Sequence, residues 1–188
     1  MITTLAYTCL MLAYFAILYM APALEPGPND RPIEGEETFL KLVTILNIVW
    51  LISFALPFFV PPLELLDPVY AAIAGGIVFG ICWWIRATAI RTLGNFFTYK
   101  LTIRPEHRVI KEGLYRYIRH PSYTGTLLQV IGMMIAGRSW AGMLGYLLSG
   151  GVVIAIRIYR EERLLCQVFG EEYETYMKST WRLIPWIY

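Results

Sequence analysis

The sequence predicts an all-α integral membrane protein with about five transmembrane helices. Of the 188 residues, 57% are hydrophobic and 16% are charged, and the mean hydropathy is +0.52, whereas soluble domains carry about a quarter charged residues. The apolar residues form stretches of about 17–25 residues, the length at which a helix crosses a bilayer. The cations gather in segments that would share one side of the membrane. We expect one compact unit, and the net charge of +2 is too small to indicate a nucleic acid as partner.

The predicted spans cover residues 2–20, 39–60, 68–85, 123–136 and 140–156. No Lys or Arg precedes the first stretch and it is too long for a signal peptide, so a retained helix is favoured. Residues 22–37 contain four prolines and five acidic residues and indicate a loop. Pro61-Pro62 ends the second span, because proline does not continue a helix. Residues 137–139 are too few for anything but a tight antiparallel turn.

The positions of the cations predict the orientation of these helices. With five spans, residues 22–37, residues 86–120 and the C-terminal tail share one side. Counting flanking positions such as Lys41, that side holds all but Arg138 of the 16 Lys and Arg residues. Loops rich in Lys and Arg stay in the cytoplasm. We therefore expect the N-terminus outside, and the C-terminus and the polar segments in the cytoplasm.

Two segments outside the spans have a character of their own. From Arg160 to Lys178, apolar residues recur at helical spacing between charged ones, and Gly170 interrupts them. This pattern predicts one or two amphipathic helices that lie on the cytoplasmic face or fold over the bundle. The basic segment 86–120 is long for a linker, so it is either a functional loop or a solvated loop that fixes topology. We divide the chain into residues 1–85, with three transmembrane helices, and residues 86–188.

Metal and disulfide sites are not indicated by the sequence. Cys9, Cys82 and Cys166 lie far apart, and His107 and His120 are the only histidines, so a zinc site lacks ligands. A role as a small buried apolar residue is favoured for Cys166 over a reactive thiol. We therefore expect no metal.

A polar run, Arg119-His120-Pro121-Ser122-Tyr123, sits at one mouth of the apolar hairpin that the last two spans form. Polar groups are costly there unless they bind something. Taken alone, the run favours a helix start, with Pro121 in the first turn and His120 satisfying a loop carbonyl. Tyr115 and Tyr123 fit equally well as anchors at headgroup depth.

Arg157 and Glu161 are four residues apart, so on a helix they lie on one face. One interpretation is an ordinary ion pair within the helix. The other is a binding site, because a guanidinium at the cytoplasmic end of a spanning helix can hold a carboxylate through two parallel hydrogen bonds. Glu162 faces the other way, and we expect it to be solvated.

Two long motifs extend these clusters. The first consists of His107-Arg-Val-Ile110, Gly113-Leu-Tyr115 and Arg119-His-Pro-Ser-Tyr123-Thr-Gly125. The second consists of Arg157-Ile-Tyr-Arg-Glu161-Glu162, Phe169-Gly-Glu-Glu-Tyr173 and Tyr176. In this order they resemble the motifs of the isoprenylcysteine carboxyl methyltransferases, and Leu93-Gly94-Asn95-Phe96 is similar to the loop entry of that family. The resemblance covers about residues 86–185, whereas the first three spans match in hydropathy alone.

The resemblance implies an S-adenosylmethionine-dependent carboxyl O-methyltransferase that methylates the C-terminal carboxylate of S-isoprenylcysteine, with residues 86–188 as its catalytic region. It places Arg157 on the substrate carboxylate, as the catalytic residue, and Glu161 on the ammonium group of S-adenosylmethionine. Lys100 falls at a further cofactor contact of the family. The cofactor-binding residues that it implies, in the cytoplasmic loop and beyond, are His107, Arg108, Val109, Ile110, Tyr115, His120, Pro121, Ser122, Tyr123 and Glu161. The partners implied are a prenylated substrate and the lipid bilayer.

The chemistry separates this prediction from its alternatives. A carboxylate is already ionised at neutral pH, so its methylation needs positioning and removal of water but no base. The phospholipid N-methyltransferases share the second motif, and their amine acceptor would need a base such as Glu162 or His120. Membrane sterol reductases, which bind a nicotinamide cofactor, resemble the region more distantly. The non-enzymatic alternative is a scaffold whose basic loop binds anionic lipid.

Overall fold

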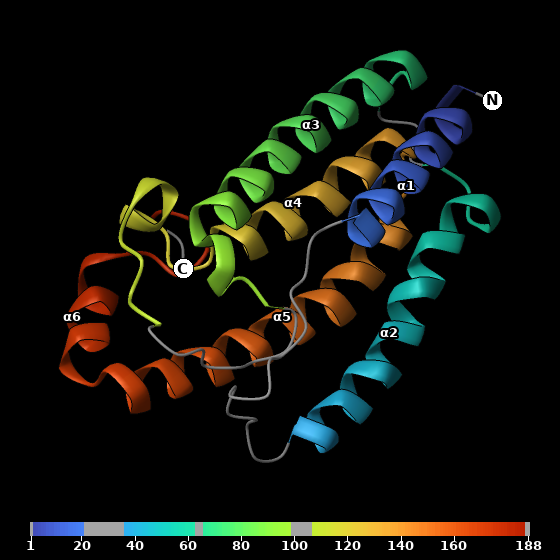
Figure 1. The fold of residues 1–188 in the computed structure, drawn as a ribbon. Coiled ribbons are helices and arrows are strands. Elements are labelled where there is room, and N and C mark those ends of the chain that lie inside the picture. Colours follow the sequence, from blue (N-terminus) through green and yellow to red (C-terminus); the bar gives the residue numbers. More distant parts are fainter. Residues whose placement is uncertain (1, 21–35, 63–65, 99–106, 187–188) are drawn as a thin grey trace.

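The computed structural model describes residues 2–20, 36–62, 66–98 and 107–186, and the regular structure in them is helical apart from one isolated β-bridge (Figure 1). The long helices of the described chain are α1 (Ile2–Met20), α2 (Glu36–Phe59), α3 (Pro68–Leu93), α4 (Pro121–Ala136) and α5 (Trp140–Phe169). They are followed by the short α6 (Glu171–Ser179), and two 3₁₀ turns, η1 (Gly94–Phe96) and η2 (Gly113–Arg116), lie between α3 and α4. The all-α prediction is confirmed.

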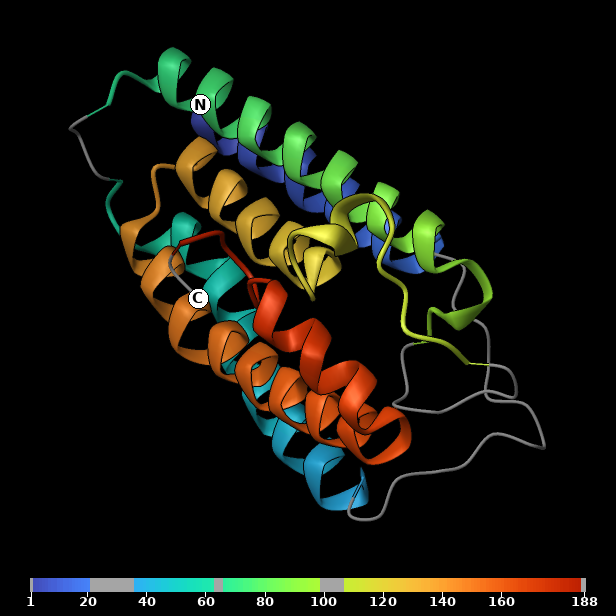
Figure 2. The same ribbon diagram turned by 90° about the vertical axis from the view of Figure 1, so that its left-hand side faces the viewer.

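The helices form two layers. In Figure 2, α1, α3 and α4 lie on one side, α2 and α5 lie on the other, and α6 folds back along α5. By length and hydropathy, two of the described helices can cross a membrane, Pro68–Phe96 and Trp140–Phe169. Each of the five predicted spans coincides with a helix, but the count of five membrane crossings stays a prediction. The loop predicted at residues 22–37 lies mostly outside the described residues.

The ends of α3 follow from its capping residues. Asp67 Oδ1 accepts hydrogen bonds from the backbone N–H groups of Val69 (2.8 Å) and Tyr70 (3.4 Å), and Pro68 opens the helix. The helix ends at Gly94, whose φ of 53° favours glycine. Our prediction that the helix stops at residue 85 was wrong, because no residue before Gly94 breaks it, so the boundary at residue 85 lies inside α3.

The second correction concerns α5. Ser139 Oγ caps its first turn by accepting from the N–H of Gly142 at 3.1 Å, and the helix runs without a break to Phe169. The segment from Arg160 that we expected to form a separate amphipathic helix is therefore divided, since its first half belongs to α5. Gly170, with φ of 53°, ends α5 and begins α6, so the predicted interruption at this glycine is confirmed.

Helices α3 and α4 pack with their backbones in contact. A Cβ atom added to Gly75 would lie 2.4 Å from the Gly132 carbonyl oxygen, and one added to Gly125 would lie 2.8 Å from the Cys82 carbonyl oxygen. Small residues that permit such close approach are typical of helix pairs in membranes. The buried Arg86 side chain also joins the two helices, because its Nη1 donates to Thr126 Oγ1 at 2.6 Å.

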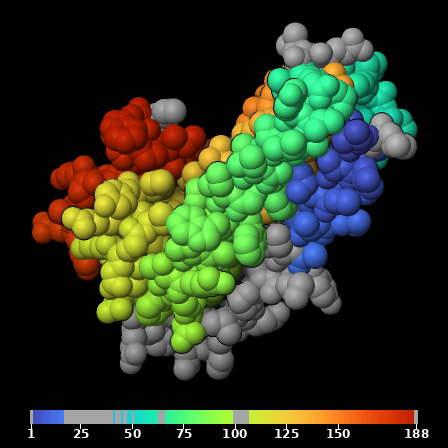
Figure 3. Space-filling model, turned by 90° about the horizontal axis from the view of Figure 1, so that it is seen from above, coloured from blue at the N-terminus to red at the C-terminus, as the bar shows by residue number. Residues whose placement is uncertain are grey.

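The C-terminal tail clamps the chain before α4. Trp181 pairs with Ile118 in a parallel bridge, and the N–H groups of Arg119 and His120 donate to the carbonyls of Trp181 (2.8 Å) and Arg182 (3.1 Å). In the space-filling view, the C-terminal residues (red) lie against the segment around residue 115 (yellow), away from α1 (Figure 3). The tail therefore fixes the place of Arg119 and His120, the first two residues of the polar run, just before α4.

The contact between α3 and α4 predicts that replacing two adjacent glycines by alanine has very different effects on the free energy of unfolding. Gly75→Ala should lower the free energy of unfolding by about 1–3 kcal/mol, the usual cost of overpacking, because the new methyl group meets the α4 backbone. Gly76→Ala should leave it equal or raise it by up to about 1 kcal/mol, since nothing lies within 4 Å of a Cβ there. Thermal unfolding of both purified variants in one detergent tests this. Equal unfolding temperatures would contradict the close contact.

Candidate functional site

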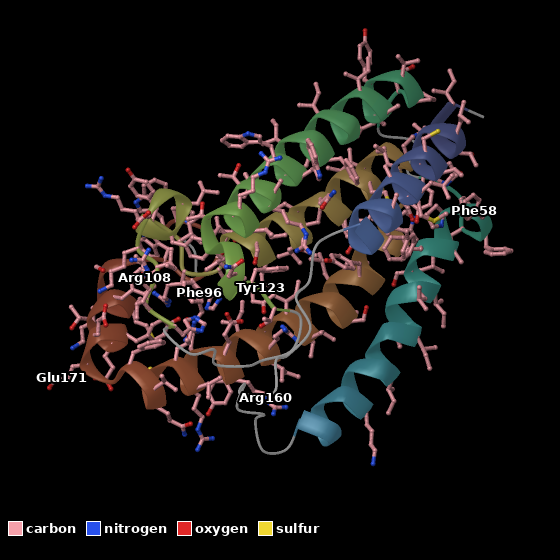
Figure 4. The ribbon with its side chains drawn as sticks, viewed as in Figure 1. Phe58, Phe96, Arg108, Tyr123, Arg160 and Glu171 are labelled. Atoms are coloured by element: carbon pink, nitrogen blue, oxygen red, sulfur yellow. The ribbon has the colours of Figure 1, made fainter. Side chains whose placement is uncertain are left out.

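Residues from both motifs line one open cavity. It lies among the C-terminal end of α3, the chain before α4, the second half of α5, and α6, and its empty volume, including the part open to solvent, is about 880 Å³. In Figure 4, Phe96, Arg108 and Tyr123 lie toward this region, whereas Arg160 and Glu171 lie on the outer sides of α5 and α6.

The structure brings together all but one of the described residues that the sequence analysis singled out. The cavity is lined by His107, Arg108, Val109, Ile110, Tyr115, His120, Ser122, Tyr123, Arg157 and Glu161. Pro121 is the exception, since it is buried in the first turn of α4 and does not line the cavity. Lys100 lies outside the described residues. The roles of these residues stay predictions.

A tyrosine links the two charged residues of α5. Arg157 Nε donates to Tyr123 Oη at 2.7 Å, and Tyr123 Oη donates to Glu161 Oε2 at 2.8 Å. Sequence spacing placed Arg157 and Glu161 on one face of the helix, but it gave no sign of the α4 hydroxyl between them. The link fixes a guanidinium and a carboxylate in one orientation at the cavity wall.

Glu162 is buried, which contradicts our prediction that it is solvated. Its side chain is 6% exposed, Oε1 accepts from Arg119 Nε at 2.9 Å, and Oε2 accepts from Arg182 Nε at 2.9 Å. His120 Nε2 lies 3.3 Å from Oε1. The partners are 43, 20 and 42 residues away in the chain, so a pattern local to α5 could not reveal them. Only the tail and the chain before α4, brought together, make this a dry ionic cluster.

Aromatic and aliphatic side chains form the remaining walls. The His107 ring stacks on Phe96, with centroids 4.8 Å apart, and tilts against Phe169 at 5.7 Å. We assigned no role in the site to the remaining wall residues. Leu93, Phe96, Arg119, Phe169, Tyr173 and Tyr176 stand in the motifs, whereas Phe97, Thr98, Leu164 and Leu165 lie outside them. The apolar ones on α5 and α6 recur at helical spacing, which we interpreted as amphipathic helices on the cytoplasmic face or folded over the bundle. Apolar residues that recur at helical spacing beside a polar motif are equally typical of a cavity wall.

Three tyrosines on the inner side of the site stay neutral. Tyr176 Oη donates to the Tyr115 carbonyl at 2.6 Å and joins α6 to η2. Burial raises the pKa of Tyr115, Tyr173 and Tyr176 above the ordinary value, and the charge of Glu161 raises the first two further. These hydroxyls are therefore hydrogen-bond donors at neutral pH.

The arrangement suits a ligand that carries a cationic and an aromatic part. Glu161, with its side chain 28% exposed, offers a carboxylate to a cation, and the aromatic walls offer stacking surfaces. Arg157 offers a guanidinium to an anion. Among the described residues, no group of three or more His, Cys, Asp or Glu side chains could hold a metal ion.

Comparison with known proteins gives a consistent result. Residues 72–167 match the model of the isoprenylcysteine carboxyl methyltransferase (ICMT) family. A protein-S-isoprenylcysteine O-methyltransferase of Dictyostelium discoideum is 30% identical over 119 residues, 56% of this chain and 50% of the relative. One of Schizosaccharomyces pombe is 26% identical over 167 residues, 88% of this chain and 66% of the relative.

A solved structure is similar as well. It is a eukaryotic intramembrane Ras methyltransferase, an isoprenylcysteine carboxyl methyltransferase, with a TM-score of 0.58 and 26% identity, and the match covers 82% of this chain and 55% of that one. The chain spans about half the length of most of the curated relatives it matches. The family match over residues 72–167 contains the first motif and the Arg157–Glu162 part of the second.

The buried tyrosines predict a loss of stability at alkaline pH. Because folding raises the pKa of Tyr115, Tyr173 and Tyr176 above about 10, the unfolded state loses these protons first. Their contribution to stability is present below pH 10 and is lost as the pH rises further. Unfolding temperatures from pH 8 to 11 test this, and Tyr176→Phe should weaken the pH dependence. Tyr117→Phe, at a side chain that is 61% exposed, should not; equal effects would contradict the prediction.

Proposed function

This chain belongs to the isoprenylcysteine carboxyl methyltransferase family, and we propose that it transfers a methyl group from S-adenosylmethionine to the C-terminal carboxylate of an S-isoprenylcysteine. The observation that carries the proposal is the single cavity on which both motifs converge, with Arg157 and Glu161 linked through Tyr123 at its wall. A guanidinium and a carboxylate that are held side by side can bind an anionic and a cationic ligand next to each other, as the transfer of a group between the two ligands requires.

The chemistry of the cavity fits S-adenosylmethionine. Glu161 is an acceptor for the ammonium group of the cofactor. The stacked rings of Phe96 and His107 offer a flat face to an adenine. His107 to Ile110, Tyr115, His120, Ser122 and Tyr123 would complete the cofactor site, and Pro121 supports it from beneath as the first residue of α4. When bound, S-adenosylmethionine supplies a sulfonium methyl group, which a carboxylate oxygen can attack without prior activation.

The residues of this chain would then act by positioning the substrate carboxylate. Arg157 would hold the substrate carboxylate, and its hydrogen bond to Tyr123 fixes the direction of the guanidinium. The apolar walls from α5 and α6 exclude water from the nucleophile. No base is needed, and Glu162 is poorly placed to serve as one because Arg119 and Arg182 already occupy its oxygens. This removes Glu162 as the base that an amine acceptor would need, and the acceptor test below addresses His120.

The architecture suits a substrate that is partly lipid. We place residues 1–85 as a membrane anchor with three crossings and residues 86–188 as the catalytic region, with the N-terminus outside and the C-terminus cytoplasmic. The cavity lies at the end of the bundle that carries Arg108, Arg119 and Arg157, whereas residues 137–139, at the turn between α4 and α5, contain Arg138. The soluble cofactor would therefore enter from the cytoplasm. The prenyl chain would enter from the bilayer, between apolar helices.

Two substitutions on α5 should separate cofactor binding from turnover. Glu161→Ala should weaken the binding of S-adenosylhomocysteine by about 10- to 100-fold, the value of a hydrogen bond to a charged group. Arg157→Ala should preserve that affinity and lower kcat/KM for the acceptor by at least about 30-fold, since it removes one partner of a charge pair. Calorimetry and a labelled-methyl assay measure the two effects. Glu171→Ala and Arg163→Ala, both at exposed positions, are the matched controls. No binding of S-adenosylhomocysteine to the unmodified protein would refute the proposed function.

The acceptor class is tested by competition in one membrane preparation. With labelled S-adenosylmethionine, a prenylcysteine should receive the methyl group, and phosphatidylethanolamine should not. A free cysteine without the prenyl chain should react at least about 100-fold more slowly, because it lacks the apolar part that places it in the bilayer. Methylation of phosphatidylethanolamine alone would replace the proposal with a phospholipid N-methyltransferase.

A further inference from the structure

We infer that Glu162 is a positioning residue that keeps a proton on Nε2 of His120, so that His120 Nδ1 presents a lone pair toward Glu161 at the cavity. There Nδ1 would accept a hydrogen bond from the ammonium group of S-adenosylmethionine, beside the Glu161 carboxylate. This second part rests on the proposed function. The first part concerns the protein alone.

The imidazole of His120 lies between two adjacent carboxylates. Its Nε2 is 3.3 Å from Glu162 Oε1, and its Nδ1 is 4.0 Å from Glu161 Oε1. The side chain is 3% exposed, so the solvent does not compete for either nitrogen. Glu162 belongs to the dry ionic cluster, whereas Glu161 lines the cavity. The two ring nitrogens therefore face different surroundings.

The state of Glu162 decides which nitrogen carries the proton. Arg182 reaches Oε2 at 2.9 Å through Nε and 2.8 Å through Nη2, and Arg119 reaches Oε1 at 2.9 Å. Two guanidinium groups at this range keep the carboxylate ionised, and an ionised carboxylate only accepts hydrogen bonds. His120 Nε2 must therefore donate, and in the neutral ring Nδ1 is left as an acceptor.

The ring has little freedom to escape this arrangement. It stacks on Tyr123, with centroids 5.6 Å apart and planes at 28°, and the backbone N–H of His120 donates to the Arg182 carbonyl at 3.1 Å. Arg182 thus fixes the backbone of His120 and the carboxylate that orients its ring. A carboxylate that sets the tautomer of a histidine in this way is familiar from metal and protease sites.

The tautomer matters because an ammonium group brings three N–H donors. Glu161 accepts from one of them, and a lone pair on His120 Nδ1 accepts from a second. A proton on Nδ1 would set two donors against each other and weaken cofactor binding. The effect belongs to affinity, since neither group touches the methyl group in transit, so it should change KM for the cofactor more than kcat.

The tautomer can be read directly in the ligand-free protein. The chain has two histidines, so ¹⁵N-histidine labelling gives two imidazole spectra, and His107→Gln assigns them. Across a pH series in detergent micelles, the neutral His120 ring should carry its proton on Nε2. A neutral ring protonated on Nδ1 would overturn the inference, whatever the protein binds.

Three variants distinguish a role of Glu162 in positioning His120 from a role in protein stability alone. Glu162→Gln places an amide against His120 and its arginines, so the Nδ1–H tautomer should appear and KM for S-adenosylmethionine should rise roughly tenfold, with kcat changed less than about twofold. Arg182→Gln removes a tail contact but leaves the carboxylate on His120, so it should lower the unfolding temperature and keep the Nε2–H tautomer. Glu172→Gln, at an exposed pair with Lys111 (2.9 Å), should change nothing.

The outcomes also distinguish this inference from the proposed function. An unchanged tautomer and KM in Glu162→Gln would overturn the inference while S-adenosylmethionine still binds. An Nε2–H tautomer in a protein that binds no S-adenosylhomocysteine would support the role of Glu162 toward His120 and refute the proposed function. An equal rise of KM in Glu162→Gln and Arg182→Gln, without a change of tautomer, would reduce Glu162 to a structural contact.

Discussion

The buried carboxylate of Glu162 is the constraint on which the site depends. It joins three parts of the chain: α5, which carries it, the residues before α4, which supply Arg119 and His120, and the tail, which supplies Arg182. A buried carboxylate without such partners would cost about 3–5 kcal/mol, so these segments must assemble together. Tyr123 and Glu161 face the cavity only because this cluster holds the start of α4 against the second half of α5.

A second constraint comes from the glycines between α3 and α4. Their backbones meet at Gly75 and Gly132 and again at Gly125, which makes this pair of helices a stiff support. Since α4 begins in the polar run, the support carries the cavity residues at one end. The arrangement separates the tasks: apolar small residues hold the helices, and charged residues beyond them form the binding site. A partly lipidic substrate and a soluble cofactor could then approach from different sides.

The sequence predicted the positions of the helices well because each rests on local signals. Apolar runs, Pro61-Pro62 and the turn at residues 137–139 locate the helices to within a few residues, and Gly170 is found as the break before α6. The lengths of α3 and α5 were underestimated, because we ended both helices where the apolar run ends. The charged residues do not end a helix: α3 continues to Gly94 and α5 to Gly170, two glycines with positive φ. The glycines inside α3 and α5 and Pro57 inside α2 do not end their helices.

The sequence by itself determined the all-α class, the family resemblance, and the residues that would gather at one site. Local spacing and motif order carry that information. Only the tertiary structure decided how those residues act on one another: that Tyr123 links Arg157 to Glu161, and that Glu162 is buried rather than solvated. The reason is physical. Burial and charge pairing depend on partners tens of residues away, and the tail that supplies Arg182 finds its place only when the chain folds.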